Sequence, residues 1–436
     1  MNRKQIIRII VFVIIFVALL IKANSIFAAA DYRNYQWVRG FYEEQEESLD
    51  AVCIGSSKMY AYWNPLEAWS QYGIAGFPYT TSSQHFMAAE YLIKEAVKTQ
   101  PNAVFVVGVN SVGETDFGMV SCHYLLDYMP FSLNKIQLTQ RLAECGEHEF
   151  FESMELYVPL IRFHSRWNEL TEEDFTYSVD GLKGANLKED YLNKDTKIGD
   201  PSNLSKEKGK IYKNLREGLD SLLNYCDEEK IQVLFVSVPC MEEEIEIVNS
   251  MKDIIVDRGY PFLELNQEID AMGLDLTQDY YNTTHTNIHG SIKVTQYLAE
   301  YLMKNYGFED KRGNETYSSW DEAVAKYWDI IGKSVLDFEW EAGNRDYSIE
   351  AVNEVTAEKT EDTVELSWEE SLNADGYMVY RKVDDGNWEN IAVAEACNFY
   401  DVDLIGESYQ YRIVPFGEKD GNICYGNFEY KGVTVE

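Results

Sequence analysis

Positive charge is scarce in this chain. Lysine and arginine number 38 against 74 aspartate and glutamate residues, so the formal net charge is −36 over 436 residues. Proteins that bind nucleic acid present a basic face to the phosphates. The composition therefore argues against a nucleic-acid partner and favours an exposed, soluble location for most of the chain. An anionic polymer would need a local basic patch, which the sequence does not reveal.

Metal-binding patterns and a disulfide framework are also lacking. The seven cysteines are an odd number, with no CxxC pair and no Cys/His cluster. We therefore expect no metal and no cofactor. Cys53 and Cys240 lie in or beside apolar runs and are expected to be buried thiols. Cys397 and Cys424 could pair with each other or remain free.

The first 30 residues begin with basic side chains and continue with an apolar run. Arg3, Lys4 and Arg8 precede Ile9–Ile21, the order found in a secretory signal peptide or a signal anchor. Counted from Ile6, the run approaches the length of a membrane span. Basic residues on the N-terminal side predict that this end stays in the cytoplasm.

The segment over residues 1–30 is expected to remain as a single-pass anchor, with the rest of the chain outside the cytoplasm. Ala28–Ala30 could instead form a cleavage site, which would release a secreted protein. Residues 31–48 are polar and aromatic with an acidic run, and we expect them to be a solvated spacer.

A short apolar run followed by two serines marks the candidate nucleophile. Ala51–Ile54 predicts a short buried strand, and Gly55 ends it, because glycine permits a sharp turn and a close approach of other backbone. Ser57 would then lie at the carboxyl end of a strand, where open α/β sheets bind their ligands. The same residues are also typical of an ordinary strand-to-helix turn with a serine N-cap.

A second stretch offers the base that such a serine needs, since a hydroxyl alone is a weak nucleophile. Residues 279–290, DYYNTTHTNIHG, precede an amphipathic helix. His285 lies on this loop, from which it can return to the end of the first strand. Asn282 and Asp279 precede it by three and six positions.

The order of these two blocks resembles the SGNH/GDSL hydrolase family. The first block of that family carries Gly-Asp-Ser or Gly-Ser-Ser, here Gly55-Ser56-Ser57. The last carries Asp-x-x-His, here Asn282-Thr283-Thr284-His285. The chain looks most like the membrane-anchored extracytoplasmic branch, which includes the D-alanyl transfer protein of teichoic acid synthesis and the alginate O-acetylation proteins. The resemblance covers residues 43–306 and implies an α/β fold, a flavodoxin-like three-layer parallel sheet.

The resemblance also implies roles for individual residues. Ser57 would be the nucleophile and His285 the general base. The oxyanion would be held by the Ser57 amide, by a glycine at Gly73 or Gly76, and by Asn110 at the end of a strand.

One position departs from the family pattern. Asn282 stands where the family has an aspartate, and an asparagine can orient the imidazole but carries no charge. Three outcomes follow: Asp279 becomes the third member, a Ser57–His285 dyad suffices, or the site only binds.

Strands alternate with helices through a domain that we place at residues 49–306. This alternation predicts a parallel sheet with right-handed crossovers. Strands are expected at 102–109, 231–238 and 262–265, and helices at 83–99, 132–144, 148–169, 206–229 and 242–258.

Residues 115–204 are expected to be an insertion in this domain, and residues 177–204 of it a long mobile loop or lid. His164 and Arg166 in the insertion, with Tyr60 near the nucleophile, could line a substrate groove. Each of them is explained equally well by packing on the sheet or in the core.

The character of the chain changes after residues 307–346, a linker with one expected helix at 318–331. Residues 347–436 contain short alternating runs broken by Gly and Asp-Gly turns, which predict an all-β sandwich. The runs resemble a fibronectin type III module, with Trp368 as a core residue and one of the late tyrosines, Tyr409 and Tyr411, at a strand corner.

These features lead to a preferred function and a rival. The first is an extracytoplasmic serine esterase or O-acyltransferase acting on an acylated cell-surface polysaccharide. The rival is a catalytically weak or inactive surface protein that binds a glycan or an assembly partner. Expected partners are a glycan or cell-wall polymer, the membrane through the N-terminal helix, and a protein or carbohydrate contact through the C-terminal module.

Overall fold

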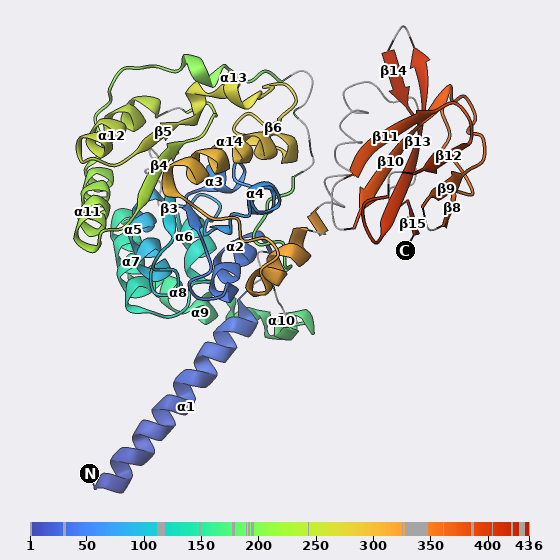
Figure 1. The fold of residues 1–436 in the computed structure, drawn as a ribbon. Coiled ribbons are helices and arrows are strands. Elements are labelled where there is room, and N and C mark those ends of the chain that lie inside the picture. The colour runs from blue at the N-terminus through green and yellow to red at the C-terminus, as the bar shows by residue number, and fades with distance from the viewer. Residues whose placement is uncertain are drawn as a thin grey trace. The chain divides into compact units, whose positions relative to one another are not determined.

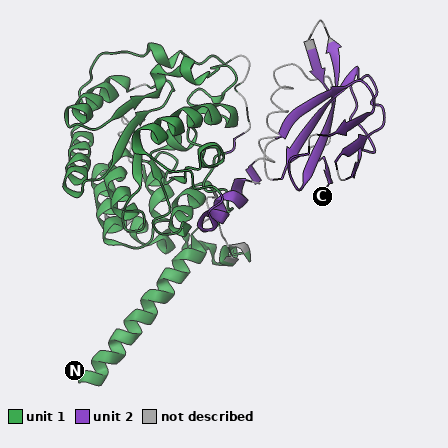
Figure 2. Ribbon diagram, in the orientation of Figure 1, with its two compact units in different colours: residues 1–186, 190–312 green, residues 187–189, 313–436 purple. Residues whose placement is uncertain are grey.

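The protein forms two compact units, residues 1–186 with 190–312 and residues 187–189 with 313–436 (Figure 2). The computed structural model describes residues 2–28, 32–110, 118–147, 150–176, 179–188, 190, 192, 196–242, 244–324, 326–327, 348–360, 362–384, 388–402, 404–419, 422–426 and 432–435.

The first unit opens with α1 (Arg3–Phe27), one helix of 25 residues. Its length and composition are sufficient to cross a membrane, which is compatible with the anchor or signal expected from the sequence. Asn2 caps the helix by accepting a hydrogen bond from the Gln5 amide at 2.9 Å.

A parallel five-stranded sheet forms the centre of this unit, as the alternation of strands and helices predicts (Figure 1). Its strand order, β2-β1-β3-β4-β5, is that of flavodoxin-like sheets. The strand β2 was not predicted, because its three residues include a glycine and a proline and give no periodic signal. The strands are β1 (Ala51–Ile54), β2 (Gly76–Pro78), β3 (Val104–Gly108), β4 (Val233–Ser237) and β5 (Phe262–Glu264).

Both faces of the sheet are buried, which explains the nearly continuous apolar runs of β1, β3 and β4. One face packs against α4 (Pro65–Tyr72) and α14 (Ile288–Tyr306), where Leu298 and Leu302 join Cys53 and Val106 in one core cluster. The opposite face carries α5 (Ala89–Ala96) and α11 (Lys213–Glu229), which contact each other. The loops that follow the strands are thereby held on a rigid layer.

Several helices are shorter than predicted. The helix expected at 148–169 is broken at Pro159, because proline removes an amide donor from a helix interior. The further helical segments of this unit are α6 (Met119–Leu126), α7 (Leu133–Cys145), α8 (Phe150–Tyr157), α9 (Pro159–Phe163), α10 (Glu173–Thr176), α12 (Ile245–Asp257), α13 (Ile269–Met272) and the turns η1 (Phe86–Ala88), η2 (His164–Asn168), η3 (Pro201–Asn203) and η4 (Leu265–Gln267).

The expected spacer at 31–48 is instead largely the helix α2 (Tyr32–Glu43), packed into the domain. Trp37, Val38 and Phe41 are 2%, 0% and 1% exposed. These side chains lie at helical spacing on one face, a signal that the acidic run after them obscures.

Residues 179–186 of the predicted lid pack against α2, whereas residues 190, 196–197, 199–200 and 203 are exposed. The Trp37 indole donates to the Gly184 carbonyl at 2.7 Å, and the Asp180 amide donates to Gln36 Oε1 at 2.7 Å. Residues 179–186 therefore lie fixed along α2.

The second unit is an antiparallel β-structure of two sheets, with orders β11-β10-β13-β14 and β12-β9-β8, and with β15 paired to β13. Leu366 of one sheet, and Trp368 just after its strand, share a core with Tyr377 and Tyr411 of the other sheet. The Tyr409 hydroxyl donates to the Gly406 carbonyl at 2.7 Å. The strands are β8 (Thr356–Lys359), β9 (Val364–Ser367), β10 (Gly376–Val383), β11 (Trp388–Ala394), β12 (Asn398–Asp401), β13 (Tyr409–Lys419), β14 (Asn422–Tyr425) and β15 (Val433–Val435), preceded by η5 (Glu315–Tyr317).

All seven cysteines are free thiols, so Cys397 and Cys424 do not pair. Cys53 and Cys240 are buried, as predicted.

Candidate active site

The turn after β1 places Ser57 at the carboxyl edge of the sheet. A Cβ atom at Gly55 would lie 2.9 Å from the Met59 Cβ atom, so the short helix α3 (Ser57–Tyr60) can approach the strand end only over a glycine. Ser56 is the N-cap of α3 and accepts from the Lys58 amide at 3.4 Å. One serine therefore caps the helix, and the Ser57 hydroxyl is left for another partner.

A small hairpin carries His285 to this edge. It consists of β6 (Tyr280–Asn282) and β7 (His285–Thr286), which pair antiparallel. Asn282 closes the turn, because its Oδ1 accepts the backbone amides of Thr284 and His285, each at 3.0 Å. The hairpin leads directly into α14, which packs on the sheet.

The two side chains meet at hydrogen-bond distance. His285 Nε2 lies 2.8 Å from Ser57 Oγ, although the residues are 228 positions apart in the chain. On the other side of the ring, His285 Nδ1 lies 3.0 Å from Asn282 Oδ1. Ser57, His285 and Asn282 are thus connected in series by hydrogen-bond contacts, the arrangement that activates a serine.

Backbone hydrogen bonds decide the tautomer of His285. Two amide N–H groups donate to the Asn282 side chain, so the atom they reach must be its oxygen. An oxygen 3.0 Å from Nδ1 favours the tautomer with the hydrogen on Nδ1, and the Thr284 hydroxyl, also 3.0 Å from Nδ1, completes the contacts of that nitrogen. Nε2 is then an acceptor, and the Ser57 hydroxyl donates to it. This is the state in which an imidazole can take the serine proton.

The environment makes His285 a weak base. Burial, and secondly the positive charge of Lys58, lower the pKa of His285 to about 4. The Tyr281 ring stacks on the imidazole with centroids 5.6 Å apart. Asn282 brings no negative charge to offset these effects, so the imidazole is neutral at neutral pH.

Any ester hydrolysis in which His285 acts as the base should keep a constant rate on the acid side down to about pH 5. The imidazole must be neutral to accept the proton, and its pKa of about 4 means that only more acidic solution protonates it. The measurement is kcat/KM between about pH 3.5 and 8 on a short-chain ester. An acid limb centred on the usual histidine value of 6.5 would contradict the buried, Lys58-adjacent environment of the ring.

Asp279 does not replace the missing carboxylate. Its Oδ2 accepts from Lys293 Nζ and from the Asp275 amide, each at 2.7 Å. The side chain is 1% exposed, and burial raises the pKa of this carboxyl group. Asp279 therefore stabilises the segment that leads into α14, and Asn282 is the residue that contacts Nδ1 of the imidazole.

A charged cluster that the sequence did not suggest lies next to the nucleophile. Lys58 Nζ and Glu242 Oε2 are 2.9 Å apart, and the two side chains are 13% and 3% exposed. Asn110 Nδ2 donates to the same oxygen at 3.3 Å, while Asn110 Oδ1 accepts the Val238 amide at 2.8 Å. No local pattern could reveal a pair 184 positions apart.

Of the predicted oxyanion donors, Asn110 lies at the right edge, but its amide group already donates to Glu242. Gly73 and Gly76 lie elsewhere. Gly76 pairs with Ala51 at the start of β1, the end of the strand opposite to Ser57. Gly73 has a φ of 67° and caps α4. These assignments were wrong because the short β2 that separates the glycines from the site was not recognised.

Of the three predicted substrate-binding residues, His164 and Arg166 lie away from Ser57, and Tyr60 lies on the same helix α3 but is buried. Arg166 donates to the Phe27 carbonyl at the end of α1 and to Asp174, each at 2.9 Å. His164 begins η2, directly after α9. Figure 1 shows α9 and α10 beside the end of α1, away from α3. Tyr60 is 5% exposed and stacks on Trp37 at 3.8 Å, so it is a core residue.

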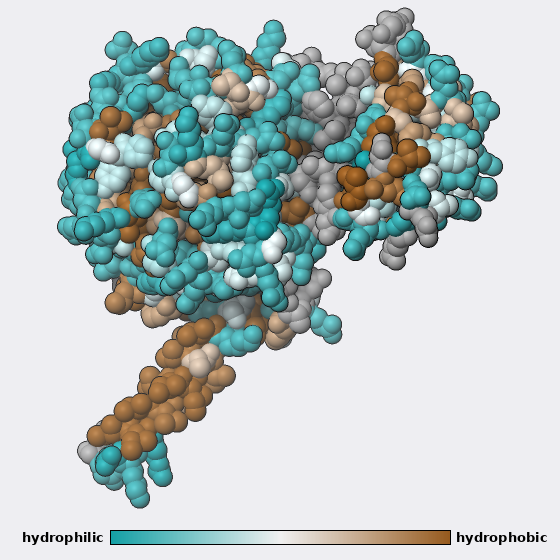
Figure 3. Space-filling model, in the orientation of Figure 1, coloured by the Kyte–Doolittle hydropathy of each residue, from teal (hydrophilic) through white to brown (hydrophobic). Residues whose placement is uncertain are grey.

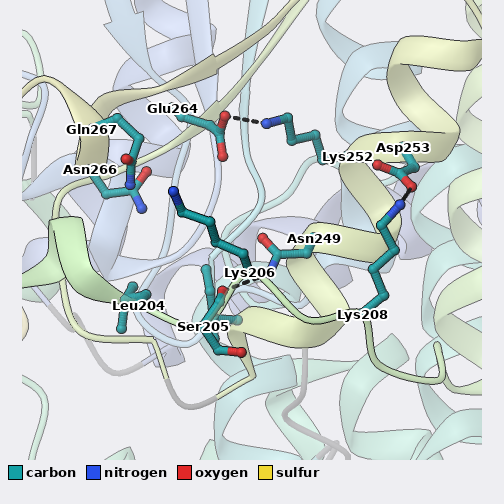
Figure 4. Close-up of a pocket in the computed structure, with 11 residues that line it drawn as sticks. Leu204, Ser205, Lys206, Lys208, Asn249, Lys252, Asp253, Glu264, Asn266 and Gln267 are labelled. Atoms are coloured by element: carbon teal, nitrogen blue, oxygen red, sulfur yellow. Dashed lines mark hydrogen bonds and ion pairs between the residues drawn. The ribbon is translucent and has the colours of Figure 1, made fainter.

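A polar cavity of about 260 Å³ lies apart from the pair, beside β5 and α12 (Figure 4). Lys252 pairs there with Glu264, and Lys208 with Asp253. The Lys206 ammonium extends toward Asn266, Gln267 and Glu264. Neither Ser57 nor His285 lines this cavity.

Comparisons with known proteins leave the family unassigned. No protein-family model matches the chain, and no curated protein matches it. The solved structures that match include that of FN3tt, at 21% identity over 20% of this chain and 89% of that chain, with a TM-score of 0.16. Another is a Fn3-like protein from Clostridium thermocellum, at 20% identity over 18% of this chain and 85% of that chain, with a TM-score of 0.15. At such scores the likeness supports no conclusion about the whole chain.

Proposed function

We propose that the first unit is an SGNH-type serine esterase or O-acyltransferase. It would work outside the cytoplasm on an acylated cell-surface polysaccharide. The observation that carries the proposal is the 2.8 Å contact between Ser57 Oγ and His285 Nε2, with the tautomer held by Asn282. The position of Ser57, at the carboxyl edge beside the point where the strand order reverses between β1 and β3, supports it.

The reaction would proceed in two transfers. Ser57 Oγ bonds to the acyl carbon as its proton passes to His285 Nε2. The bond to the sugar oxygen then breaks, and the proton passes from His285 to that oxygen. Water or an acceptor hydroxyl attacks the acyl-serine by the same steps in reverse. The Ser57 amide, at the start of α3, could hold the oxyanion.

The other parts of the chain suit a surface location. The helix α1 would be a single-pass anchor. The second unit would be a fibronectin type III-like module that acts as a spacer or contacts carbohydrate or protein, and its Tyr409–Gly406 corner supports that assignment.

A fluorophosphonate probe tests the proposal directly. It phosphonylates a serine only where a base activates the hydroxyl. The full chain should be labelled within minutes to hours, and peptide mass spectrometry should place the adduct on Ser57. Prior treatment with a histidine-modifying reagent should suppress it. Intact protein without an adduct on Ser57 would reject the esterase and acyltransferase alike.

A binding protein without turnover is the second candidate. The low pKa of His285 and the uncharged Asn282 favour it, because an imidazole with a pKa of about 4 is a poor base. Under this alternative the glycan binds at the Ser57 edge, but the probe leaves Ser57 unmodified.

A further inference from the structure

The last turns of α1 are held by the insertion. Residues 2–19 of α1 are exposed, whereas Leu20, Ala23, Asn24, Ile26 and Phe27 are partly covered. The covering elements are α9, η2 and α10, each in contact with α1. Figure 1 shows α9 and α10 beside the C-terminal end of this helix.

Hydrogen bonds fix this contact at two points. The Leu160 amide donates to Asn24 Oδ1 at 2.8 Å, and Arg166 Nη1 donates to the Phe27 carbonyl at 2.9 Å. A bond to a backbone carbonyl at a helix end satisfies a group that the helix itself leaves open. These bonds join the insertion and the end of α1 into one element.

The length of α1 places this element at the outer membrane surface. A hydrocarbon core of about 30 Å takes about 20 helical residues. With Arg3 and Lys4 among the inner headgroups, and with the long side chains of Arg8 and Lys22 reaching toward the headgroups on their own sides, the span that begins at Ile6 leaves the hydrocarbon close to Ser25. Apolar residues are brown along most of α1 in Figure 3. Asn24 and Phe27, and the groups bonded to them, then lie at the outer boundary.

The elements at this depth expose large apolar side chains. Ile161, Trp167 and Phe175 are 42%, 72% and 56% exposed. They lie on α9, η2 and α10, the three segments that contact α1. Tryptophan is enriched where a protein meets the boundary of a bilayer, since its ring suits a partly polar, partly apolar layer. Exposed apolar side chains that gather on neighbouring segments mark an interaction surface.

We propose that residues 159–176 rest on the outer surface of the lipid bilayer, with the side chains of Ile161, Trp167 and Phe175 among the headgroups. The proposal depends on the anchoring role of α1 and is independent of the chemistry at Ser57. A bilayer is the favoured occupant because α1 itself delivers this segment to it. The segment carries two arginines against three glutamates and one aspartate, so its net charge does not attract anionic lipid. Burial of the apolar side chains would supply the binding free energy, and vesicles of zwitterionic lipid should therefore be sufficient.

Brominated lipid tests the position of Trp167. The full chain is placed in phosphatidylcholine vesicles with or without bromine on the acyl chains near the headgroups, and wild type is compared with Trp167→Phe. The chain has nine tryptophans, so the difference between the two proteins isolates the emission of Trp167. We expect bromine to lower that emission at least twofold, and aqueous iodide to leave it nearly unchanged.

Variants and vesicle flotation separate the outcomes. Ile161→Asn with Phe175→Asn should reduce the bromine effect, whereas Val256→Asn, at a position 49% exposed on α12, should not. If the protein floats with the vesicles but iodide still quenches Trp167, the lipid contact is overturned and the surface is assigned to a protein partner. Protein that does not float overturns the anchor as well. Labelling of Ser57 is unaffected in either case.

Discussion

Replacing Ser57 by alanine is expected to lower ester hydrolysis by about 10³-fold or more. Loss of the nucleophile in a serine protease costs roughly 10⁶ in kcat, and an enzyme with a weaker base has less rate to lose. The hydroxyl lies 2.8 Å from His285 Nε2, so alanine removes the reacting oxygen and leaves the imidazole without that partner. The measurement is steady-state hydrolysis of a short-chain nitrophenyl ester by the full chain.

The neighbouring serine provides a matched control. Ser56→Ala removes the cap of α3, which should cost about 1 kcal/mol of stability, and leaves the nucleophile in place. Its hydrolysis rate should remain within about threefold of wild type if the fold is retained. Equal rates for wild type and Ser57→Ala would end the proposal that Ser57 reacts.

Asn282→Asp is expected to increase the rate, between about tenfold and 10⁴-fold. The upper figure is the cost of the opposite exchange in a serine protease. The new carboxylate would accept from Nδ1 and from the amides of Thr284 and His285, as the asparagine oxygen does now. Its negative charge would stabilise the imidazolium and raise the pKa of His285 from about 4 toward neutrality.

Two readouts distinguish this mechanism from a general effect on the fold. The acid limb of kcat/KM should move to higher pH in Asn282→Asp, since the base then protonates more readily. The gain should vanish when His285→Gln is added, because it passes through the imidazole. A variant that folds normally but shows neither a faster rate nor a shifted limb would mean that the ring does not serve as the base.

Periodicity and motif order predicted the features with strong local signals. The β-branched runs of β1, β3 and β4 could only be buried strands, and the parallel sheet follows from their alternation with helices. Ser57 and His285 were paired from their order along the chain and lie within hydrogen-bond distance. Their use in catalysis remains a prediction.

Features that depend on distant residues could not be predicted. Lys293 of α14 forms an ion pair with the Asp279 carboxylate, so Asn282 and not Asp279 is the residue next to the imidazole. The Lys58–Glu242 pair joins two loops whose proximity follows only from the completed sheet. The three residues of β2 lack a periodic signal, so Gly73 and Gly76 were placed at the wrong end of the strand.

The unpaired state of all seven thiols has a practical consequence. Burial raises the pKa of Cys226 to about 12, and it also raises that of Cys53, so reactive thiolate is rare at both positions. Oxidants would therefore attack them slowly. We therefore expect recombinant material to refold in the presence of a reductant.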